Sequence, residues 1–473
     1  MRLRHLLPLA LLLVSAGSAR AGSFRRQCDA WWSFRLDGSS HGYALELVPG
    51  GKPQVAADWT KPDAPGLFAV GVSTYDPPPP KGDRRARWFG PLGNIYNRPQ
   101  REISLHWNGR EIANRVCSAA LVTPRPQSAH LRIEFRAGGA YVSVVIGGAD
   151  AVYNRYFVPE LTPYAWQAAF HNLTPSHVRT RLSGGSFRMR PPIRVQAIDR
   201  AFLNPQVTSA SNTVTFPPAV GIGRVICTLR LDPGPKGFDA WDRIGQIMVS
   251  GDDGKPIEIY RYITPYGTPW QWKMDMTDYL PILTGKRTVT VDSGTYSQGW
   301  DVSVRFDFFT GRRKLVPYRV VSLWSGSFPA GDWEKPMDAY LPPVRVPTDA
   351  FTAAAKLRLS QTGHGQNEDN LGEFAPLWRE VICNGRRWRN TLWTTDNYLN
   401  PDRPQMGTWK FDRAGWGPGT VDPPWSIDLT PVLEPGNALL LAYHLQPYRK
   451  KTLTSQPANE VLSAQVILYR RGG

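Results

Sequence analysis

Leu131-Arg132-Ile133-Glu134-Phe135, followed after Gly138-Gly139 by Tyr141-Val142-Ser143-Val144-Val145-Ile146, largely alternates apolar with polar residues along both arms. Successive side chains of a β-strand point to opposite faces, so this alternation predicts two strands that each bury one face. The glycine pair between them favours a tight hairpin turn. Short runs of this kind recur along the chain, separated by turn residues that include 43 glycines and 43 prolines, which indicates an all-β protein.

Proline-rich joints divide the chain of 473 residues into several parts. At about 150 residues per domain, a chain of this length has room for roughly three domains. The strand-like run Gln465-Val466-Ile467-Leu468-Tyr469 is expected to be the last core strand. We predict a signal peptide at residues 1–21, an N-terminal β-rich accessory domain at 22–190, a second domain at 191–315 and a third at 316–473.

The first residues of the chain have the features of a secretory signal. Basic residues precede the apolar run Leu6–Val14, and Ala19-Arg20-Ala21 provides small residues for cleavage. The apolar run is far shorter than the roughly 20 residues that span a bilayer. We therefore expect cleavage near Ala21, a mature chain that begins near Gly22, and a secreted or periplasmic bacterial protein with no integral membrane segment.

The charge is strongly basic, with a formal net charge of +17 at pH 7. Nucleic acid is one possible partner of such a chain, but the lysines and arginines are spread along the whole length without a basic block or a nucleic-acid-binding motif. A basic enzyme that meets acidic glycoproteins or a negatively charged envelope fits the same charge. We therefore expect no nucleic-acid partner.

The four cysteines are too few for a disulfide scaffold. Cys28 and Cys117 lie in one domain of an exported protein, so we predict that they form a disulfide bond. Cys227 and Cys383 each lie in an apolar, strand-like run, and we predict that they are buried thiols.

Histidines and cysteines offer no metal-ligand spacing. Only His364 and His444 fall in the second half of the chain, and neither belongs to a pair with the spacing of a metal site. Two histidines are also too few for a copper monooxygenase, a class that uses paired β-sandwich domains. We expect no metal and no other cofactor.

Several short motifs occur in a fixed order across the second and third domains. They are Asp239-Ala240-Trp241-Asp242-Arg243, Arg261-Tyr262-Ile263-Thr264-Pro265-Tyr266, Thr362-Gly363-His364-Gly365, Glu373-Phe374, Gly407-Thr408-Trp409 and Asp412-Arg413-Ala414-Gly415-Trp416-Gly417-Pro418-Gly419. In residues and in order they resemble the catalytic unit of the peptide-N-glycosidase F family. The shared order makes the resemblance more specific than any single motif does.

This resemblance implies two eight-stranded jelly-roll β-sandwich domains side by side, with a glycan-binding cleft at their junction. It also implies an amidase without a cofactor, which hydrolyses the bond between an N-linked glycan and its asparagine and converts that asparagine to aspartate. The expected partners are N-glycoproteins and glycopeptides, recognised at their chitobiose core, and we expect the enzyme to be a monomer.

By position, Asp242 corresponds to the principal catalytic aspartate of the family and Glu373 to its assisting glutamate. A third acidic residue of the family aligns with Asp292-Ser293, and whether Asp292 replaces it stays open. Other residues fall on positions that line the cleft or bind the inner sugars: Arg243, Ile263, Gly363, His364, Arg413 and Trp416.

Amide hydrolysis requires acid–base groups of this kind, independently of the resemblance. Water must be activated at the carbonyl carbon and a proton must reach the departing nitrogen, and two carboxyl groups in different environments can divide these tasks. Arg243 beside Asp242 would keep that carboxylate charged. Arg413 could brace an oxyanion, and Trp416 could offer an apolar face to a sugar ring.

Each residue also has a structural alternative. Asp242 and Arg243 could be a surface ion pair, His364 could support its loop, and Trp416 could be a core residue. The family has cysteines around the position of Glu373 where this chain has Leu371 and Ala375, so packing must hold that loop. At the level of the whole protein, the alternative is a non-catalytic N-glycan-binding jelly-roll protein.

Overall fold

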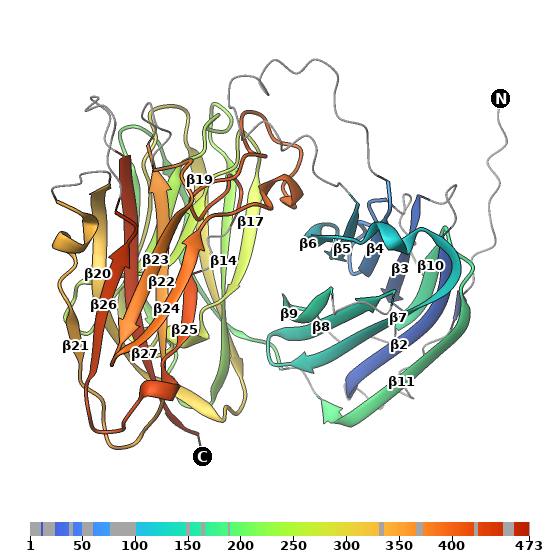
Figure 1. Cartoon of the computed structure of the whole chain (residues 1–473), viewed down its shortest axis with the longest axis horizontal. Coiled ribbons are helices and arrows are strands. Elements are labelled where there is room, and N and C mark those ends of the chain that lie inside the picture. The colour runs from blue at the N-terminus through green and yellow to red at the C-terminus, as the bar shows by residue number, and fades with distance from the viewer. Residues whose placement is uncertain are drawn as a thin grey trace. The chain divides into compact units, whose positions relative to one another are not determined.

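The computed structural model describes residues 11–12, 24–36, 41–49, 60–75, 101–147, 152–161, 166–187, 190–330, 335–365, 372–420, 424–447 and 458–472. These residues form β-strands joined by loops and a few short 3₁₀ helices (Figure 1), which confirms the all-β prediction. Contacts divide the chain into two compact units, residues 1–191 with 399–401, and residues 192–398 with 402–473. The domain limits at residues 190 and 315 stay predictions.

The first unit is a sandwich of two antiparallel sheets, with strand orders β1-β10-β3-β4-β5-β6 and β11-β2-β7-β8-β9. Trp32 and Leu131 from one sheet pack with Leu45 and Val70 from the other in one buried core. Its elements are β1 (Leu11–Leu12), β2 (Phe24–Leu36), β3 (Gly42–Pro49), β4 (Phe68–Ser73), β5 (Glu102–Trp107), β6 (Glu111–Val116), η2 (Ala119–Leu121), β7 (Thr123–Arg136), β8 (Gly139–Ile146), β9 (Tyr153–Pro159), β10 (Trp166–His171) and β11 (Ser176–Phe187).

The hairpin predicted from the alternation is formed by β7 and β8. Glu134 lies opposite Tyr141, and Arg136 lies opposite Gly139 at the turn. Gly138 has a φ of 76°, in the left-handed region that favours glycine. A Cβ atom on Gly139 would lie 2.2 Å from the carbonyl oxygen of Val158, so the backbone of β9 leaves no room for a side chain there.

The predicted signal segment lies almost wholly outside the described residues. Of it, only Leu11 and Leu12 are described, and they pair with Ala169 and Ala168 of β10. Within the part of the chain that the structure describes, no helix combines the length and hydropathy needed to cross a membrane.

The second unit begins with an eight-stranded roll, here called the first jelly roll, whose two antiparallel sheets have the orders β12-β19-β14-β17 and β13-β18-β15-β16. Leu229 and Phe306 from one sheet meet Ile247 and Val291 from the other in a buried core. Its elements are β12 (Ile193–Leu203), β13 (Ser209–Phe216), β14 (Ile222–Pro233), β15 (Ile244–Ser250), β16 (Pro256–Ile263), β17 (Trp270–Asp275), η3 (Thr277–Tyr279), β18 (Gly285–Ser293) and β19 (Trp300–Thr310).

The second jelly roll follows, with the strand orders β20-β27-β22-β25 and β21-β26-β23-β24. The predicted final strand, residues 465–469, lies within β27, which pairs on one side with β20 and on the other with β22. Its elements are β20 (Leu315–Ala330), η4 (Met337–Tyr340), β21 (Val344–Val346), β22 (Thr352–His364), β23 (Leu377–Cys383), β24 (Arg386–Leu392), η5 (Asn397–Leu399), β25 (Trp425–Asp428), η6 (Thr430–Val432), β26 (Leu439–Leu445) and β27 (Ala458–Arg471).

The two jelly rolls lie side by side, as predicted, and polar contacts join them. Asp278 of the first roll accepts a hydrogen bond from the Tyr469 hydroxyl at 2.8 Å and forms ion pairs with Lys356 at 3.1 Å and Arg358 at 3.0 Å. Burial raises the pKa of Asp278, but Arg358 and Lys356 outweigh it and lower the pKa to about 2. The carboxylate is therefore charged at neutral pH and holds the rolls together.

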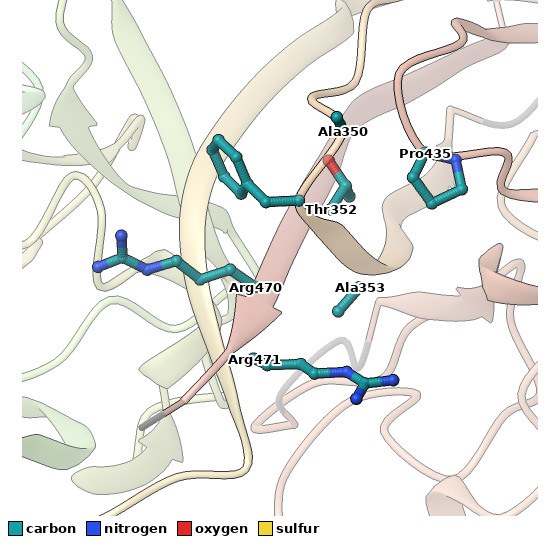
Figure 2. Close-up of a pocket in the computed structure, with 7 residues that line it drawn as sticks. Ala350, Thr352, Ala353, Pro435, Arg470 and Arg471 are labelled. Carbon is teal, nitrogen blue, oxygen red and sulfur yellow. The ribbon is translucent and has the colours of Figure 1, made fainter.

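A cavity of about 710 Å³ opens at one end of the second jelly roll (Figure 2). It lies where β22 begins and β27 ends, and the side chains of Arg470 and Arg471 extend in opposite directions from it. No residue predicted for the site lines this cavity, since Gly363 and His364 lie at the other end of β22. The lining residues are Ala350, Phe351, Thr352, Ala353, Pro435, Arg470 and Arg471.

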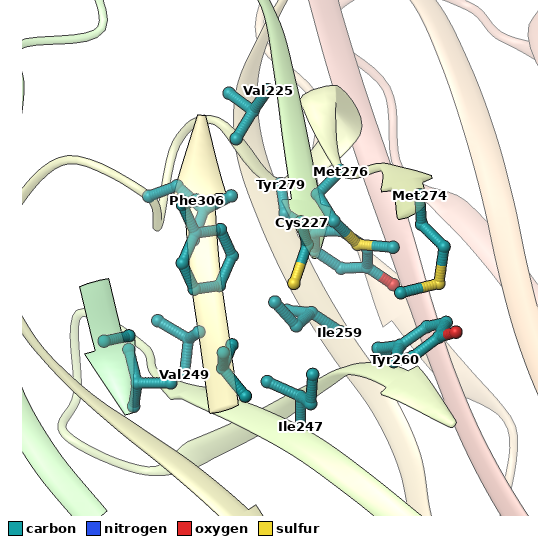
Figure 3. Packing of buried hydrophobic residues seen from close by; sticks show 14 of the residues in the cluster. Val225, Cys227, Ile247, Val249, Ile259, Tyr260, Met274, Met276, Tyr279 and Phe306 are labelled. Atoms are coloured by element: carbon teal, nitrogen blue, oxygen red, sulfur yellow. The ribbon is translucent and has the colours of Figure 1, made fainter. Parts of the chain in front are cut away.

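The predicted disulfide bond is absent, because all four cysteines are free and buried. Cys28 faces the core from β2, whereas Cys117 follows β6 of the other sheet and its thiol donates to the Ser73 carbonyl oxygen at 3.4 Å. Burial raises the pKa of Cys28 to about 12, so its thiol is protonated and unreactive. Cys227 and Cys383 are buried thiols as predicted, and Cys227 lies among Phe306, Tyr279 and Ile259 (Figure 3).

Candidate active site

The loop between β14 and β15 presents Asp242, and a buried carboxylate holds this loop in place. Asp239 is fully buried and accepts hydrogen bonds from the Trp241 backbone N–H at 2.9 Å and from the Thr295 hydroxyl. The Arg243 backbone N–H donates to the Thr264 hydroxyl at 2.8 Å. The backbone on both sides of Asp242 is thus fixed, which leaves the Asp242 side chain 16% exposed.

Asp242 has two close partners. Its Oδ2 atom accepts a hydrogen bond from the Tyr266 hydroxyl at 2.7 Å and lies 3.4 Å from Nη2 of Arg413. Burial raises the pKa of Asp242 above its usual value, although Arg413, Tyr266 and Arg243 oppose the shift. A carboxyl with a raised pKa can exchange a proton closer to neutral pH than an ordinary aspartate can.

Arg243 does not form the predicted pair with Asp242. Its Nε atom lies 3.6 Å from Asp239, and its guanidinium stacks over the ring of Tyr296 at 4.8 Å. The charge of Arg243 lowers the pKa of Asp242, in the expected direction, but Arg413 and Tyr266 lower it more, and burial outweighs all three.

Arg413 joins the two predicted catalytic carboxylates. Its guanidinium is fully buried, with Nη1 2.9 Å from Oε1 of Glu373 and Nη2 3.4 Å from Oδ2 of Asp242. Nη2 also donates to the Thr408 hydroxyl at 2.8 Å. One planar fork thus holds a carboxylate from each jelly roll, an arrangement for which arginine is suited and lysine is not.

Aromatic rings support this guanidinium from within the second roll. It lies 4.5 Å from the ring of Trp416 and 5.0 Å from that of Phe374. Trp416 is 4% exposed, its indole N–H donates to the Gly363 carbonyl oxygen at 2.7 Å, and His364 stacks on its ring. This burial agrees with the alternative that Trp416 is a core residue, and it leaves little ring surface for a sugar.

Gly363 and His364 form the floor below Trp416. A Cβ atom on Gly363 would lie 2.3 Å from the carbonyl oxygen of Gly372, so the close approach of two backbone segments requires glycine. The His364 ring contacts the Thr362 hydroxyl at 2.7 Å. Burial, followed by the charges of Arg261 and Arg413, lowers the pKa of His364 to about 3, so the ring is neutral at physiological pH.

Arg261 of the first roll contacts the second roll next to Gly363 and His364. It is 1% exposed, pairs with Glu258 at 2.7 Å, and donates to the Thr362 hydroxyl at 3.1 Å and the Val461 carbonyl oxygen at 2.5 Å. The predicted residue Ile263, two positions further along β16, is also buried and acts through its backbone. Its N–H donates to the carbonyl oxygen of Thr420, and its carbonyl oxygen accepts from the N–H of Gly419, the last residue of the motif that carries Arg413.

Asp292 lies on β18, opposite Gln246 of β15. Its residue is half-buried, and burial raises its pKa. Asp292 contacts neither Asp242 nor Glu373 among the hydrogen bonds and ion pairs of the described residues, so the structure does not bring it into the Arg413 cluster.

Two kinds of site residue escape sequence reasoning. Tyr266 and Thr408 fall within quoted motifs, but a single tyrosine or threonine carries no signal of its role in a chain with 18 tyrosines. Trp241 and Tyr296 are 58% and 88% exposed beside Asp242 and Arg243. Large exposed aromatic rings near a candidate catalytic carboxylate are suited to bind the apolar face of a sugar.

Within the described residues, no three histidine, cysteine, aspartate or glutamate side chains come together as a group that could hold a metal ion. Asp242 and Glu373 face arginine and tyrosine instead.

Comparison with known proteins gives a consistent result. Residues 335–466 match the family described as peptide-N-glycosidase F, C terminal. The peptide-N(4)-(N-acetyl-beta-D-glucosaminyl)asparagine amidase F of Elizabethkingia miricola is 28% identical over 246 residues, which cover 48% of this chain and 69% of that protein.

Solved structures of the same family share the fold. A recombinant peptide:N-glycanase F is matched at 22% identity with a TM-score of 0.52, over 59% of this chain and 96% of that one. PNGase F from Flavobacterium meningosepticum, described as a glycosylasparaginase, is matched at 23% identity with the same TM-score and coverage. These matches confirm the resemblance that the motifs suggested.

Proposed function

From its relationship to the peptide-N-glycosidase F family, we propose that this chain is a peptide-N4-(N-acetyl-β-glucosaminyl)asparagine amidase. It would hydrolyse the amide bond between an N-glycan and asparagine, release the glycan as a glycosylamine and leave aspartate. The observation that carries the proposal is the fork of Arg413, which holds Asp242 and Glu373 at 3.4 and 2.9 Å. A protein that only bound glycans would have no need of two carboxylates in unequal environments.

Asp242 is the residue that moves protons in this proposal. Its carboxylate takes a proton from water as the water oxygen attacks the carbonyl carbon of the glycosylated asparagine. The bond from that carbon to nitrogen then breaks, and Asp242 returns the proton to the departing nitrogen. The raised pKa of Asp242 suits both transfers, because it makes the group a better base than an ordinary aspartate and a usable acid afterwards.

Arg413 and Glu373 are assigned a supporting role. Arg413 is fully buried and its guanidinium is occupied by Asp242, Glu373 and Thr408, so it holds the carboxylates rather than bracing an oxyanion. Glu373 contacts the Nη1 atom of the guanidinium, whereas Asp242 lies near Nη2, and at 15% exposure Glu373 can still orient water or a sugar hydroxyl.

The proposed substrates are N-glycoproteins and glycopeptides, bound through the chitobiose core. Trp241 and Tyr296 are the exposed rings that could take the sugars, with Gly363 and His364 forming the floor behind Arg413. The proposed location is secreted or periplasmic, and the proposed state is a monomer that needs no cofactor.

A glycopeptide digested in ¹⁸O-labelled water tests the reaction. Mass spectrometry should find aspartate with one ¹⁸O atom in place of the glycosylated asparagine. Loss of the glycan with one sugar left on the peptide would identify an endoglycosidase and refute the amidase.

Asp242→Asn tests the assigned residue, because it keeps the volume and removes the ionisable group. General acid–base catalysis contributes about 10²–10⁴-fold, so the variant should lose at least that much activity while its melting temperature shows a folded protein. Glu373→Gln should lose less. If both variants keep full activity, the site is wrongly assigned; if wild type binds glycopeptide without turnover, the glycan-binding alternative replaces the enzyme.

A further inference from the structure

A buried carboxyl group lies directly behind the candidate active site. Glu460 lies on β27, opposite Gly363 of β22 and Phe328 of β20, and is fully buried. Its Oε2 atom accepts a hydrogen bond from the Gln361 amide at 3.0 Å, while Oε1 has no hydrogen-bond partner among the described residues. An ionised carboxylate with an unsatisfied buried oxygen is costly, so this packing favours the neutral form.

The groups that face Glu460 favour its ionised form, but they do not outweigh burial. Gln361 Oε1 accepts from the Tyr443 hydroxyl at 2.5 Å and lies 3.4 Å from Arg379, so the amide is oriented toward the carboxyl. The charged groups nearby are Arg379 on β23 and Arg261 on β16, and neither forms an ion pair with Glu460 within the described part of the chain. Burial raises the pKa of Glu460 to about 7, although Gln361 and both arginines oppose it.

The strand pairing connects this carboxyl to the site. Residues 362, 363 and 364 of β22 lie opposite residues 461, 460 and 459 of β27. Gly363 accepts the indole hydrogen bond of Trp416, and the ring of Trp416 supports the guanidinium of Arg413. A change of charge at Glu460 therefore acts on the strand pair that forms the floor of the site.

We propose that Glu460 is a positioning residue of this active site, whose neutral form holds the ends of β22 and β27 in the arrangement that supports Trp416 and Arg413. The effect on activity rests on the proposed amidase function, whereas the effect on structure does not. Ionisation of Glu460 places a buried charge beside Gly363 that has no ion-pair partner among the described residues, which loosens the floor. Since the pKa is about 7, about one tenth of the molecules keep the neutral form at a pH one unit higher.

The structural part is tested without any substrate, by NMR of histidine-labelled protein. His364 follows Gly363 on β22, opposite Asn459 of β27, and its ring has a pKa of about 3, so it does not itself titrate between about pH 5.5 and pH 9. Its signals, assigned with His364→Gln, should shift with a midpoint near pH 7 in wild type and stay constant in Glu460→Gln. Constant signals in wild type, or the same shift in Glu460→Gln, would overturn the proposal.

A second variant keeps the test decisive if Glu460→Gln does not fold. Gln361→Met removes the amide that stabilises the ionised form but leaves the carboxyl, so the midpoint should move to higher pH. An unchanged midpoint would show that another group causes the shift.

The activity part uses the pH profile of glycan release. Above pH 7, wild-type kcat should fall by up to about tenfold per pH unit, and Glu460→Gln should not show this fall. The exposed Glu434→Gln serves as the matched control and should retain the wild-type profile. A Glu460→Gln profile identical to that of wild type would refute the positioning role. If wild type releases no glycan at any pH, the amidase proposal fails while the histidine signals still decide the role of Glu460.

Discussion

Tyr266→Phe is expected to move the acid side of the pH–activity profile to higher pH. The Tyr266 hydroxyl donates to Asp242 at 2.7 Å, and the residue is only 6% exposed, so water cannot easily replace it. A hydrogen bond to a charged group contributes about 1.5–3 kcal/mol. At about 1.4 kcal/mol per pKa unit, its loss should raise the pKa of Asp242 by about 1–2 units.

The sign follows from the role assigned to Asp242. The base must be ionised, Tyr266 stabilises the ionised form, and its removal therefore shifts the acid limb of kcat/KM upward by about 1–2 pH units. The assay is glycan release from one glycopeptide across the pH range, with melting temperatures measured in parallel. Tyr279→Phe is the matched control, since it removes a buried hydroxyl that donates to Gln465 away from the site. An acid limb that stays in place, or moves equally in the control, would refute the reasoning.

Three further predictions concern packing, the junction and metals. Gly363→Ala should lower the free energy of unfolding, measured by denaturant titration, by about 1–3 kcal/mol and reduce activity, because the new Cβ would lie 2.3 Å from a backbone oxygen. The control Gly294→Ala places its Cβ in open space and should leave the free energy of unfolding unchanged. Asp278→Asn should lower the free energy of unfolding by about 2 kcal/mol at neutral pH, since the native pKa of about 2 lies below the unfolded value of 3.8. This difference in stability should persist above pH 3.8 and vanish as the pH falls through 2. A difference that stays constant down to pH 2 would contradict the prediction. Glycan release should survive EDTA, and a loss that Zn²⁺ restores would return the metalloenzyme class to consideration.

The fold class could be predicted from the sequence because the sequence patterns that define strands and turns are local. Alternation defines a strand within a few residues, and the glycines at 138 and 139 mark a turn that only they can form beside β9. The central position of β27 was not predictable in the same way, since its two partners β20 and β22 come from far along the chain.

The candidate site was predictable where motif order carried the information. The motifs predicted Asp242, Glu373 and Arg413, and the structure brings these three together. Sequence adjacency was misleading for Arg243, because neighbours along a loop point in different directions and its side chain reaches Asp239.

Depth within the fold was the information that the sequence lacked. An indole is suited both to a core and to a sugar, and only the contacts of Trp416 show that it lies in the core. Likewise, Cys28 and Cys117 share a domain, but Cys28 lies on β2 of one sheet and Cys117 follows β6 of the other, so each thiol has its own surroundings.

The position of β27 has a consequence for the order in which the candidate site is completed during synthesis. This strand is synthesised after the other described strands, yet it lies between β20 and β22 and supplies the Val461 carbonyl oxygen to Arg261 of the first roll. A nascent chain that already carries Asp242, Glu373 and Arg413 still lacks the strand on which their support rests. A chain truncated before residue 458 would therefore lack the strand between β20 and β22 and the contact to Arg261, so the arrangement of Asp242, Glu373 and Arg413 would be without that support.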